Sequence, residues 1–290
     1  LIGRYNRPYG ARVAEFLELL GLGVEQHEAQ LALARDHLSQ PTQPGVIYGL
    51  SPHAPYSVRP PLYRALVELA QIHDCPLAIH LAETQAELQL LAKGTGEFVD
   101  LLSDFGVWDP TAIGRGTRPL DYLQPLAVVA QALVIHGNYL NETEIDFLVE
   151  HRNISVVYCP RTHAYFRHSP HPWQQMLERG VSLALGTDSR GSNPDLSLWR
   201  ELQFLHEQFP DVDPALLFEL GTIRGAQALG VASELGTLTS GKSADMVIVT
   251  SPARGNEPYE MLLDSESVVS ATMCRGEWLP KIPDVIPDNS

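Results

Sequence analysis

The sequence predicts an α/β fold, a TIM-like (β/α)8 barrel of which five strands can be recognised, followed by a small β unit. Short apolar runs alternate with helical segments five times between residues 46 and 232. Four segments end an apolar run in histidine or aspartate, as expected where parallel strands deliver polar groups to one edge of a sheet. From about Ser233 the helical segments stop and short β-branched runs follow.

Five runs are expected to be buried parallel strands joined by right-handed crossovers, because each is apolar, short and followed by a helical segment. They are VIYGL at 46–50, PLAIHLA at 76–82, ALVIHGN at 132–138, ISVVYCP at 154–160 and VSLALGTD at 181–188. In the last run, period-two alternation places Val181, Leu183 and Leu185 towards a helix layer. The small residues between them face the crowded interior, and Asp188 points towards the barrel axis.

Helix signals fall between these strands. Residues 11–38 carry apolar residues at helical spacing, which predicts two helices or one kinked helix broken at Gly21 and Gly23. Pro60 and Pro61 begin a helix that runs to about His73. Asn141 with Glu144 forms a capping box, and the helix at WQQMLERG ends on its glycine.

The predicted domains are a barrel over residues 1–232, a small β unit over 233–279 and a tail over 280–290. Residues 1–3 resemble the end of a strand. The β unit reads as antiparallel strands of a β-sandwich part without a helix between them. The tail is rich in proline and polar residues, so loose order is expected there.

The amino-acid composition argues against two classes of binding partner. The net charge of −15 argues against nucleic acid and anionic membranes, which would repel the chain. No apolar stretch approaches the roughly 20 residues that cross a bilayer. Three scattered cysteines without metal-type spacing fit a reducing cytoplasm. A cytoplasmic protein is therefore expected. A small-molecule substrate is expected from the polar groups at the strand ends, described next, and a homo-oligomer is left open.

The polar groups at the strand ends are candidate site residues. His80 with Glu83 places an imidazole and a carboxyl at one rim, suited to a metal ligand and a proton shuttle. His136 and Asp188 end two later strands, and His53 lies in a stiff loop after the first. Each residue also has a structural interpretation that remains open. His80 and His136 fit core histidines, and Glu83 fits a glutamate at a helix start. Asp188 fits a helix N-cap, and His53 fits a loop histidine without a role.

A loop with several basic residues follows the strand at 154–160. Its sequence, CPRTHAYFRHSPH, contains Arg161 and His163. The histidine spacing lacks a helical HExxH pattern, so a substrate-facing loop is favoured over a metal site, and the charges are also compatible with simple solvation.

Taken together, the motifs SPHAPYSV, HLAET, VIHGNYL, YCPRTHAYF, LGTDS and GTLTSGKSADMVIV resemble the amidohydrolase superfamily. The similarity is to its branch of cytosine deaminase-like, methylthioadenosine/adenosylhomocysteine deaminase-like and chlorohydrolase-like enzymes. The CPRTHAYF variant is similar to aminodeoxyfutalosine deaminases. The resemblance implies one divalent metal, zinc first, with iron and manganese as alternatives.

The resemblance also implies roles. His80 and Asp188 would be metal ligands, Glu83 the general acid/base, and His136 a contact to the hydrolytic water, with Asp188 also its base. The substrate contacts would be His53, Arg161, His163 and Ser189. His163 replaces a small amide of the family pattern, which puts that contact in doubt.

The implied function is hydrolytic deamination of an amino-substituted heteroaromatic ring. Substrates like adenosine, methylthioadenosine, adenosylhomocysteine or aminodeoxyfutalosine are expected. A chlorohydrolase and a non-catalytic, metal-poor binding protein are the alternatives. The family's His-x-His pair on its first strand is absent from this sequence, so the five strands match the family's fourth to eighth. We therefore expect a fragment of a longer protein rather than a truncated relative.

Overall fold

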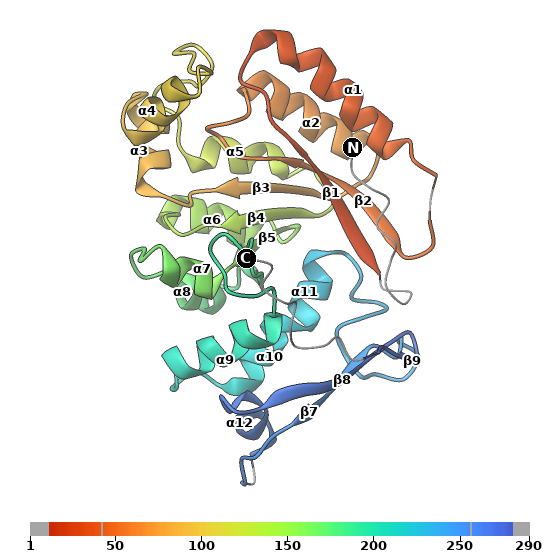
Figure 1. The fold of residues 1–290 in the computed structure, drawn as a ribbon. Helices are drawn as coiled ribbons and strands as arrows, with labels where there is room; N and C mark the ends of the chain where they lie inside the picture. Colours follow the sequence, from red (N-terminus) through yellow and green to blue (C-terminus); the bar gives the residue numbers. More distant parts are fainter. Residues whose placement is uncertain (1–11, 42, 256, 281–290) are drawn as a thin grey trace, which may run out of the picture.

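One parallel sheet forms the centre of the computed structural model, which describes residues 12–41, 43–255 and 257–280. Its six strands are hydrogen-bonded in sequence order (Figure 1). They are β1 (Val13–Leu19), β2 (Val46–Pro52), β3 (Leu77–Leu81), β4 (Ala132–His136), β5 (Ile154–Tyr158) and β6 (Ser182–Leu185). The expectations for residues 1–3 and 281–290 lie outside the described residues.

Helices connect these strands and surround the sheet, from α1 and α2 at the top of Figure 1 to α9–α11 below it. Between β1 and β4 they are the short 3-10 helix η2 (Val24–Gln26), α1 (His27–Leu38), α2 (Pro60–Ile72), α3 (Gln85–Lys93), α4 (Glu97–Asp104) and α5 (Pro119–Leu126). After β4 they are α6 (Glu142–Glu150), α7 (Pro160–Tyr165), α8 (Trp173–Glu178), α9 (Leu198–Gln208), α10 (Pro214–Gly221) and α11 (Ile223–Ala228).

The segment Val13–Leu19 is a strand, so the prediction that residues 11–38 are helical throughout was wrong in its first part. The segment pairs in parallel with β2 over its whole length, from Val13 beside Val46 to Leu19 beside Pro52. This pairing provides hydrogen-bond partners for the backbone groups of the segment that face β2. The described sheet therefore has six parallel strands rather than five.

The two faces of β6 differ as the alternation predicted. Leu183 and Leu185 belong to the large core between sheet and helices, whereas Ala184 belongs to a small inner cluster with Ala78, Leu133 and Ala228. That interior is crowded: a Cβ added at Gly186 would lie 2.8 Å from Cγ1 of Val157. The inner face of the sheet thus has small residues where the barrel interior is narrow.

Several helix boundaries follow their predicted signals. Helix α2 begins at Pro60. At α6, Oδ1 of Asn141 accepts the backbone N–H of Thr143 at 2.9 Å, and Oε2 of Glu144 accepts the N–H of Asn141 at 2.8 Å. Gly180 follows α8 with a φ of 81°, a conformation that favours glycine.

The C-terminal unit is a single antiparallel sheet of β7 (Met246–Thr250), β8 (Val268–Cys274) and β9 (Glu277–Trp278). A helix, α12 (Pro258–Leu263), lies between β7 and β8, so the expectation of no helix there was wrong. The unit is joined to α9 by Gln203, whose amide donates to the carbonyls of Asp264 and Ser267. Among the described helices, none has the length and apolar character that crossing a bilayer requires.

Helix α1 offers a matched test of this packing. Leu31 is 6% exposed and contacts the large core, whereas Leu33, two residues on, is 53% exposed. Leu31→Ala should lower the free energy of unfolding by about 2–5 kcal/mol, because it leaves a cavity. Leu33→Ala should change it by less than about 0.5 kcal/mol. Urea denaturation measures both, and equal effects would contradict the described position of α1.

Candidate active site

Three of the predicted histidines meet where the parallel strands end. His53 directly follows β2, His80 lies near the end of β3, and His136 is the last residue of β4. The ring centroids of His53 and His80 are 5.1 Å apart, and those of His80 and His136 are 5.6 Å apart. The carboxyl-terminal edge of the sheet is therefore a cluster of imidazoles.

The tautomer of His80 is fixed by its backbone partner. Nδ1 of His80 lies 2.9 Å from the carbonyl oxygen of His53, which only accepts hydrogen bonds. Nδ1 therefore carries the proton, and Nε2 has a free lone pair. Metal-binding histidines usually have this arrangement, in which a carbonyl or carboxylate orients the ring.

Glu83 lies beside His136, with Oε1 3.6 Å from Nε2 of the ring. Burial raises the pKa of the Glu83 carboxyl, and nearby Asp188 raises it further, while His80 opposes the shift. Burial, together with His80, lowers the pKa of His136 to about 3. His136 is therefore a neutral imidazole at neutral pH, next to a carboxyl that holds its proton more tightly than usual.

The backbone is strained around these groups. Ala82, His136 and Asp188 have φ values of 54°, 71° and 58°, in the left-handed region that residues with a side chain rarely adopt. Each follows or ends a strand of the central sheet. Such conformations cost about 1–3 kcal/mol and persist only where surrounding contacts hold them.

Glu87 holds the turn at Ala82. Its side chain is fully buried, and its two carboxylate oxygens accept the backbone N–H groups of Ala82 at 2.8 Å and Glu83 at 2.9 Å. Asn138 donates to the carbonyl of Glu83 at 3.0 Å. The backbone that carries Glu83 is thus hydrogen-bonded on both sides of the residue.

His171 holds the backbone of His136. Its Nε2 donates to the carbonyl oxygen of His136 at 2.8 Å, and the ring stacks on Tyr158 with centroids 4.1 Å apart. Burial lowers the pKa of His171 to about 3, so the ring is neutral. The other ring nitrogen is buried and has no hydrogen-bond partner among the described residues.

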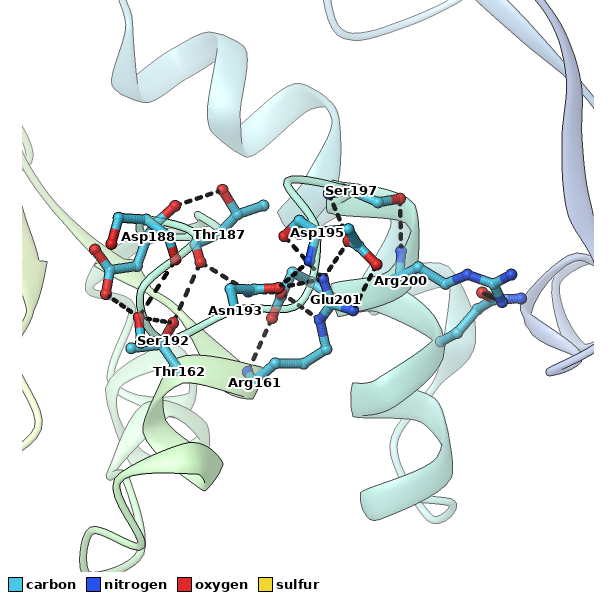
Figure 2. A network of polar contacts seen from close by, with 12 residues as sticks. Arg161, Thr162, Thr187, Asp188, Ser192, Asn193, Asp195, Ser197, Arg200 and Glu201 are labelled. Carbon is cyan, nitrogen blue, oxygen red and sulfur yellow. Dashed lines mark hydrogen bonds and ion pairs between the residues drawn. The ribbon is translucent and has the colours of Figure 1, made fainter. Parts of the chain in front are cut away.

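Asp188 is held by a network of hydroxyl and amide groups (Figure 2). The Ser192 hydroxyl donates to Oδ2 of Asp188 at 2.7 Å and lies 3.1 Å from the hydroxyl of Thr162. The amide of Asn193 donates to the carbonyl of Thr187 at 2.8 Å and to buried Glu201 at 2.7 Å. Helix α9 is capped by Ser197, so Asp188 is not its N-cap.

Arg161 belongs to the same network (Figure 2). Its guanidinium donates to Glu201 at 2.6 Å, to Asn193 at 2.6 Å and to Asp195 at 2.5 Å. These carboxylate and amide oxygens surround the guanidinium, whose side chain is only 14% exposed. The geometry therefore favours a structural role for Arg161, joining α7 to the loop after β6, over the predicted substrate contact.

Of the two remaining predicted substrate contacts, His163 is half-buried in α7 and Ser189 is exposed in the loop after β6. Nε2 of His163 donates to the carbonyl of Ser169 at 2.9 Å, which closes its own loop. Ser189 is exposed beside Asp188, and its hydroxyl accepts the N–H of Gly191 at 3.2 Å. Their contact with substrate stays a prediction.

Two residues at the site were missed in the sequence. Glu18 lies near the end of β1, and one of its carboxylate oxygens is within 4.8 Å of a ring nitrogen of both His53 and His80. Tyr56 follows His53; burial and the carboxylates of Glu83, Glu87, Glu18 and Asp188 raise the pKa of its phenol. Glu18 lies between Leu17 and Leu19 rather than at the end of an apolar run, and the segment was assigned to a helix.

These donors fit a divalent cation. His80 presents a free Nε2 lone pair, and carboxylates lie on both sides of it along the strand edge. Neutral imidazoles and carboxylates together are a ligand set for zinc and for divalent iron or manganese.

The chain is similar to several known proteins. The profile of the amidohydrolase family matches residues 22–279. A 5-methylthioadenosine/S-adenosylhomocysteine deaminase of Syntrophobacter fumaroxidans is 32% identical over 214 residues, covering 71% of this chain and 44% of the relative. An aminodeoxyfutalosine deaminase of Deinococcus radiodurans is 30% identical over 229 residues, covering 74% and 54%. The chain spans about half the length of these curated relatives.

Solved structures share the fold. The aminofutalosine deaminase of Helicobacter pylori superposes with a TM-score of 0.78 at 21% identity, covering 92% of this chain and 68% of that one. A zinc-bound adenosine deaminase from Xanthomonas campestris gives 0.73 at 24% identity, covering 93% and 61%. Atrazine chlorohydrolase from Arthrobacter aurescens, in complex with zinc, gives 0.70 at 19% identity, covering 92% and 61%.

Glu87 should make the stability of the protein depend on pH. Burial raises the pKa of its carboxyl from 4.5 to about 7, so the folded protein keeps a proton that the unfolded chain releases near pH 4.5. The stabilisation is full below that pH and is lost as the pH rises through 7. Relative to Glu87→Gln, the wild type should lose up to about 3 kcal/mol between pH 4.5 and pH 8.

Urea denaturation of both proteins at several pH values measures this difference. Titrations elsewhere in the chain cancel in it, because they are common to both proteins. A difference that stays constant over the whole range would show that Glu87 is already ionised in the folded protein at pH 4.5.

Proposed function

We propose, because this chain belongs to the amidohydrolase family, that it carries the catalytic residues of a metal-dependent hydrolytic deaminase. The substrate is an amino-substituted heteroaromatic ring, of the adenine nucleoside kind. The observation that carries the proposal is the pair of Glu83 and neutral His136, 3.6 Å apart beside the His80 ring. The named relatives support the reaction class, since they include deaminases of methylthioadenosine, adenosylhomocysteine, 5'-deoxyadenosine and aminodeoxyfutalosine.

The activity is proposed for a complete barrel. In the described sheet, β1 and β6 are edge strands, and six parallel strands are two fewer than a closed (β/α)8 barrel requires.

The C-terminal β unit also has an uncovered face. Exposed apolar residues lie on β7, β8 and β9, among them Ile248 at 45% and Trp278 at 56%. They support a second β layer, which would make the sandwich. We propose that both are completed by sequence outside the described residues.

His80 and Asp188 are the proposed ligands of one divalent ion, with zinc the first candidate because related folds hold zinc. Such an ion lowers the pKa of bound water from about 16 to about 7, which supplies hydroxide at neutral pH. Nε2 of His80 is already free for this bond. The Ser192 hydroxyl orients the carboxylate of Asp188.

The chain's own residues then move the protons. Asp188 accepts the proton of the attacking water, while neutral His136 orients that water. Water adds at the ring carbon that bears the amine. Glu83, whose pKa is raised by burial, gives its proton to the adjacent ring nitrogen and takes up the hydroxyl proton of the adduct, whose oxygen becomes the carbonyl. Glu83 passes this proton to the amine, which leaves as ammonia, and the proton held by Asp188 then restores the acid. His53, His163 and Ser189 are the proposed substrate contacts.

A chlorohydrolase is the second candidate, because the fold is also that of atrazine chlorohydrolase. In that reaction, water adds at the same kind of ring carbon and chloride leaves without needing a proton. A deaminase requires an acid at the leaving nitrogen, and Glu83 has the raised pKa suited to that role. The raised pKa of Glu83 and the deaminase relatives therefore favour the deaminase. The cytoplasmic location remains a prediction from the cysteine content, and the oligomeric state remains open.

Glu83→Gln tests the role of the acid. The variant is expressed from the whole gene. It should bind metal like the wild type, because Glu83 is not a proposed ligand. Its turnover should fall at least about 100-fold, the usual contribution of a positioned acid or base. Glu28→Gln, at an exposed position on α1, is the control. Turnover of E83Q near the control value would refute the assignment.

A substrate panel tests the reaction class. 5'-Deoxyadenosine, methylthioadenosine, adenosylhomocysteine, aminodeoxyfutalosine and atrazine are each incubated with the metal-loaded protein, and ammonia and chloride are measured. We expect ammonia from at least one of the adenine compounds and no chloride from atrazine. Chloride release without ammonia would establish the second candidate instead.

A further inference from the structure

A buried histidine in the loop between α7 and α8 holds the peptide group that follows His136. Nε2 of His171 donates to the carbonyl oxygen of His136 at 2.8 Å, and His171 is itself buried. We propose that His171 is a positioning residue of the active site, which fixes the direction of the His136 imidazole through this hydrogen bond. The inference rests on the proposed function in one respect, namely that His136 orients the attacking water.

The peptide group between His136 and Gly137 is held on both sides. Its carbonyl accepts from His171, and its N–H donates to the carbonyl of Leu81, the last residue of β3, at 3.0 Å. His136 and Gly137 both have left-handed backbone, with φ values of 71° and 66°. At His136 this conformation costs about 1–3 kcal/mol and persists only where contacts hold it. Rotation of this peptide group would change the backbone of His136 and, with it, the direction of the ring.

The surroundings of His171 fix the position of its ring. The ring stacks on Tyr158, the last residue of β5, with centroids 4.1 Å apart. Pro170 and Pro172 flank His171, and each proline ring fixes the φ angle of its own residue. Trp173, which begins α8, is buried in the large core and anchors the segment. The donor at His171 therefore has a defined place beside the end of β5.

Packing alone does not account for an imidazole at this position. Nδ1 of His171 is buried and has no hydrogen-bond partner among the described residues. A buried polar atom without a partner costs about 1–3 kcal/mol, which an apolar ring would avoid. The hydrogen bond to the carbonyl of His136 is an interaction that an apolar ring could not make. This bond therefore accounts for the presence of a histidine.

Three variants, each expressed from the whole gene, separate positioning from stability. His171→Leu removes the donor. His171→Gln keeps one, because the glutamine amide nitrogen lies as many bonds from Cβ as Nε2 does. His151→Leu is the matched control: Nδ1 of His151 donates to the carbonyl of Phe147 at 2.8 Å, and the two rings stack. The carbonyl of His151 accepts the N–H of Ile154, so this residue lies at the opposite end of β5 from Tyr158.

Kinetics and crystal structures of the zinc-loaded proteins are the two measurements. With the adenine compound that releases the most ammonia, H171L should lower kcat at least about 10-fold, because a misplacement of about 1 Å can cost about 100-fold. KM should stay within about 3-fold, since the orientation of the water acts on the transition state. H171Q should restore most of kcat, and H151L should leave it unchanged. In crystals, the His136 ring should be displaced in H171L and should keep its place in H171Q.

A His136 ring in its wild-type place in H171L would overturn the proposal. So would a wild-type kcat in that variant, or an equal fall of kcat in H151L. If H171L does not fold, His171→Asn takes its place, because the shorter amide also fails to reach the carbonyl.

The outcome is separable from the proposed function. If the ring is displaced in H171L while the wild type releases no ammonia from any adenine compound, the positioning role stands and the deaminase fails. If the wild type releases ammonia and H171L does so at the same rate, the deaminase stands and the positioning role fails.

Discussion

Parallel pairing of six strands is the constraint on which the site depends. Because the strands run in one direction, their carboxyl ends lie at a single edge, and residues from distant parts of the sequence become neighbours there. The backbone carbonyl of His53, after β2, accepts both the backbone N–H and the Nδ1–H of His80, on β3. One carbonyl group thus sets the separation of two strand ends and the tautomer of an imidazole.

The strained positions show how the fold supports this edge. Left-handed backbone at Ala82, His136 and Asp188 turns the chain sharply after three strands. Buried polar side chains hold the three turns: Glu87 accepts two backbone N–H groups, His171 donates to the carbonyl of His136, and Ser192 donates to Asp188. These buried polar side chains therefore orient the backbone and the carboxylate of Asp188 at this edge. Strain held in this way is typical of catalytic sites.

Much of this arrangement was predictable from the sequence, because a buried strand ending in a polar residue is a local signal. The runs before His53, His80, His136 and Asp188 were assigned to strands, and their alternation at Leu183 and Ala184 was confirmed. Residues Val13–Leu19 were assigned to a helix because their apolar residues also fit a helical period, and only pairing with β2 decides between the two. Because this strand was missed, Glu18 was not recognised as a candidate site residue. The role of Arg161 depends on Glu201, forty residues away, and no local pattern contains it.

The most direct measurement of the central claim is anomalous X-ray diffraction from crystals of the zinc-loaded protein, recorded at the zinc absorption edge. The claim is that groups from separate β strands converge on one cation. It predicts one strong peak about 2.0–2.1 Å from Nε2 of His80, with the carboxylate of Glu83 close by but not bound. A peak bound to residues away from the carboxyl ends of the strands, with none at His80, would contradict the account.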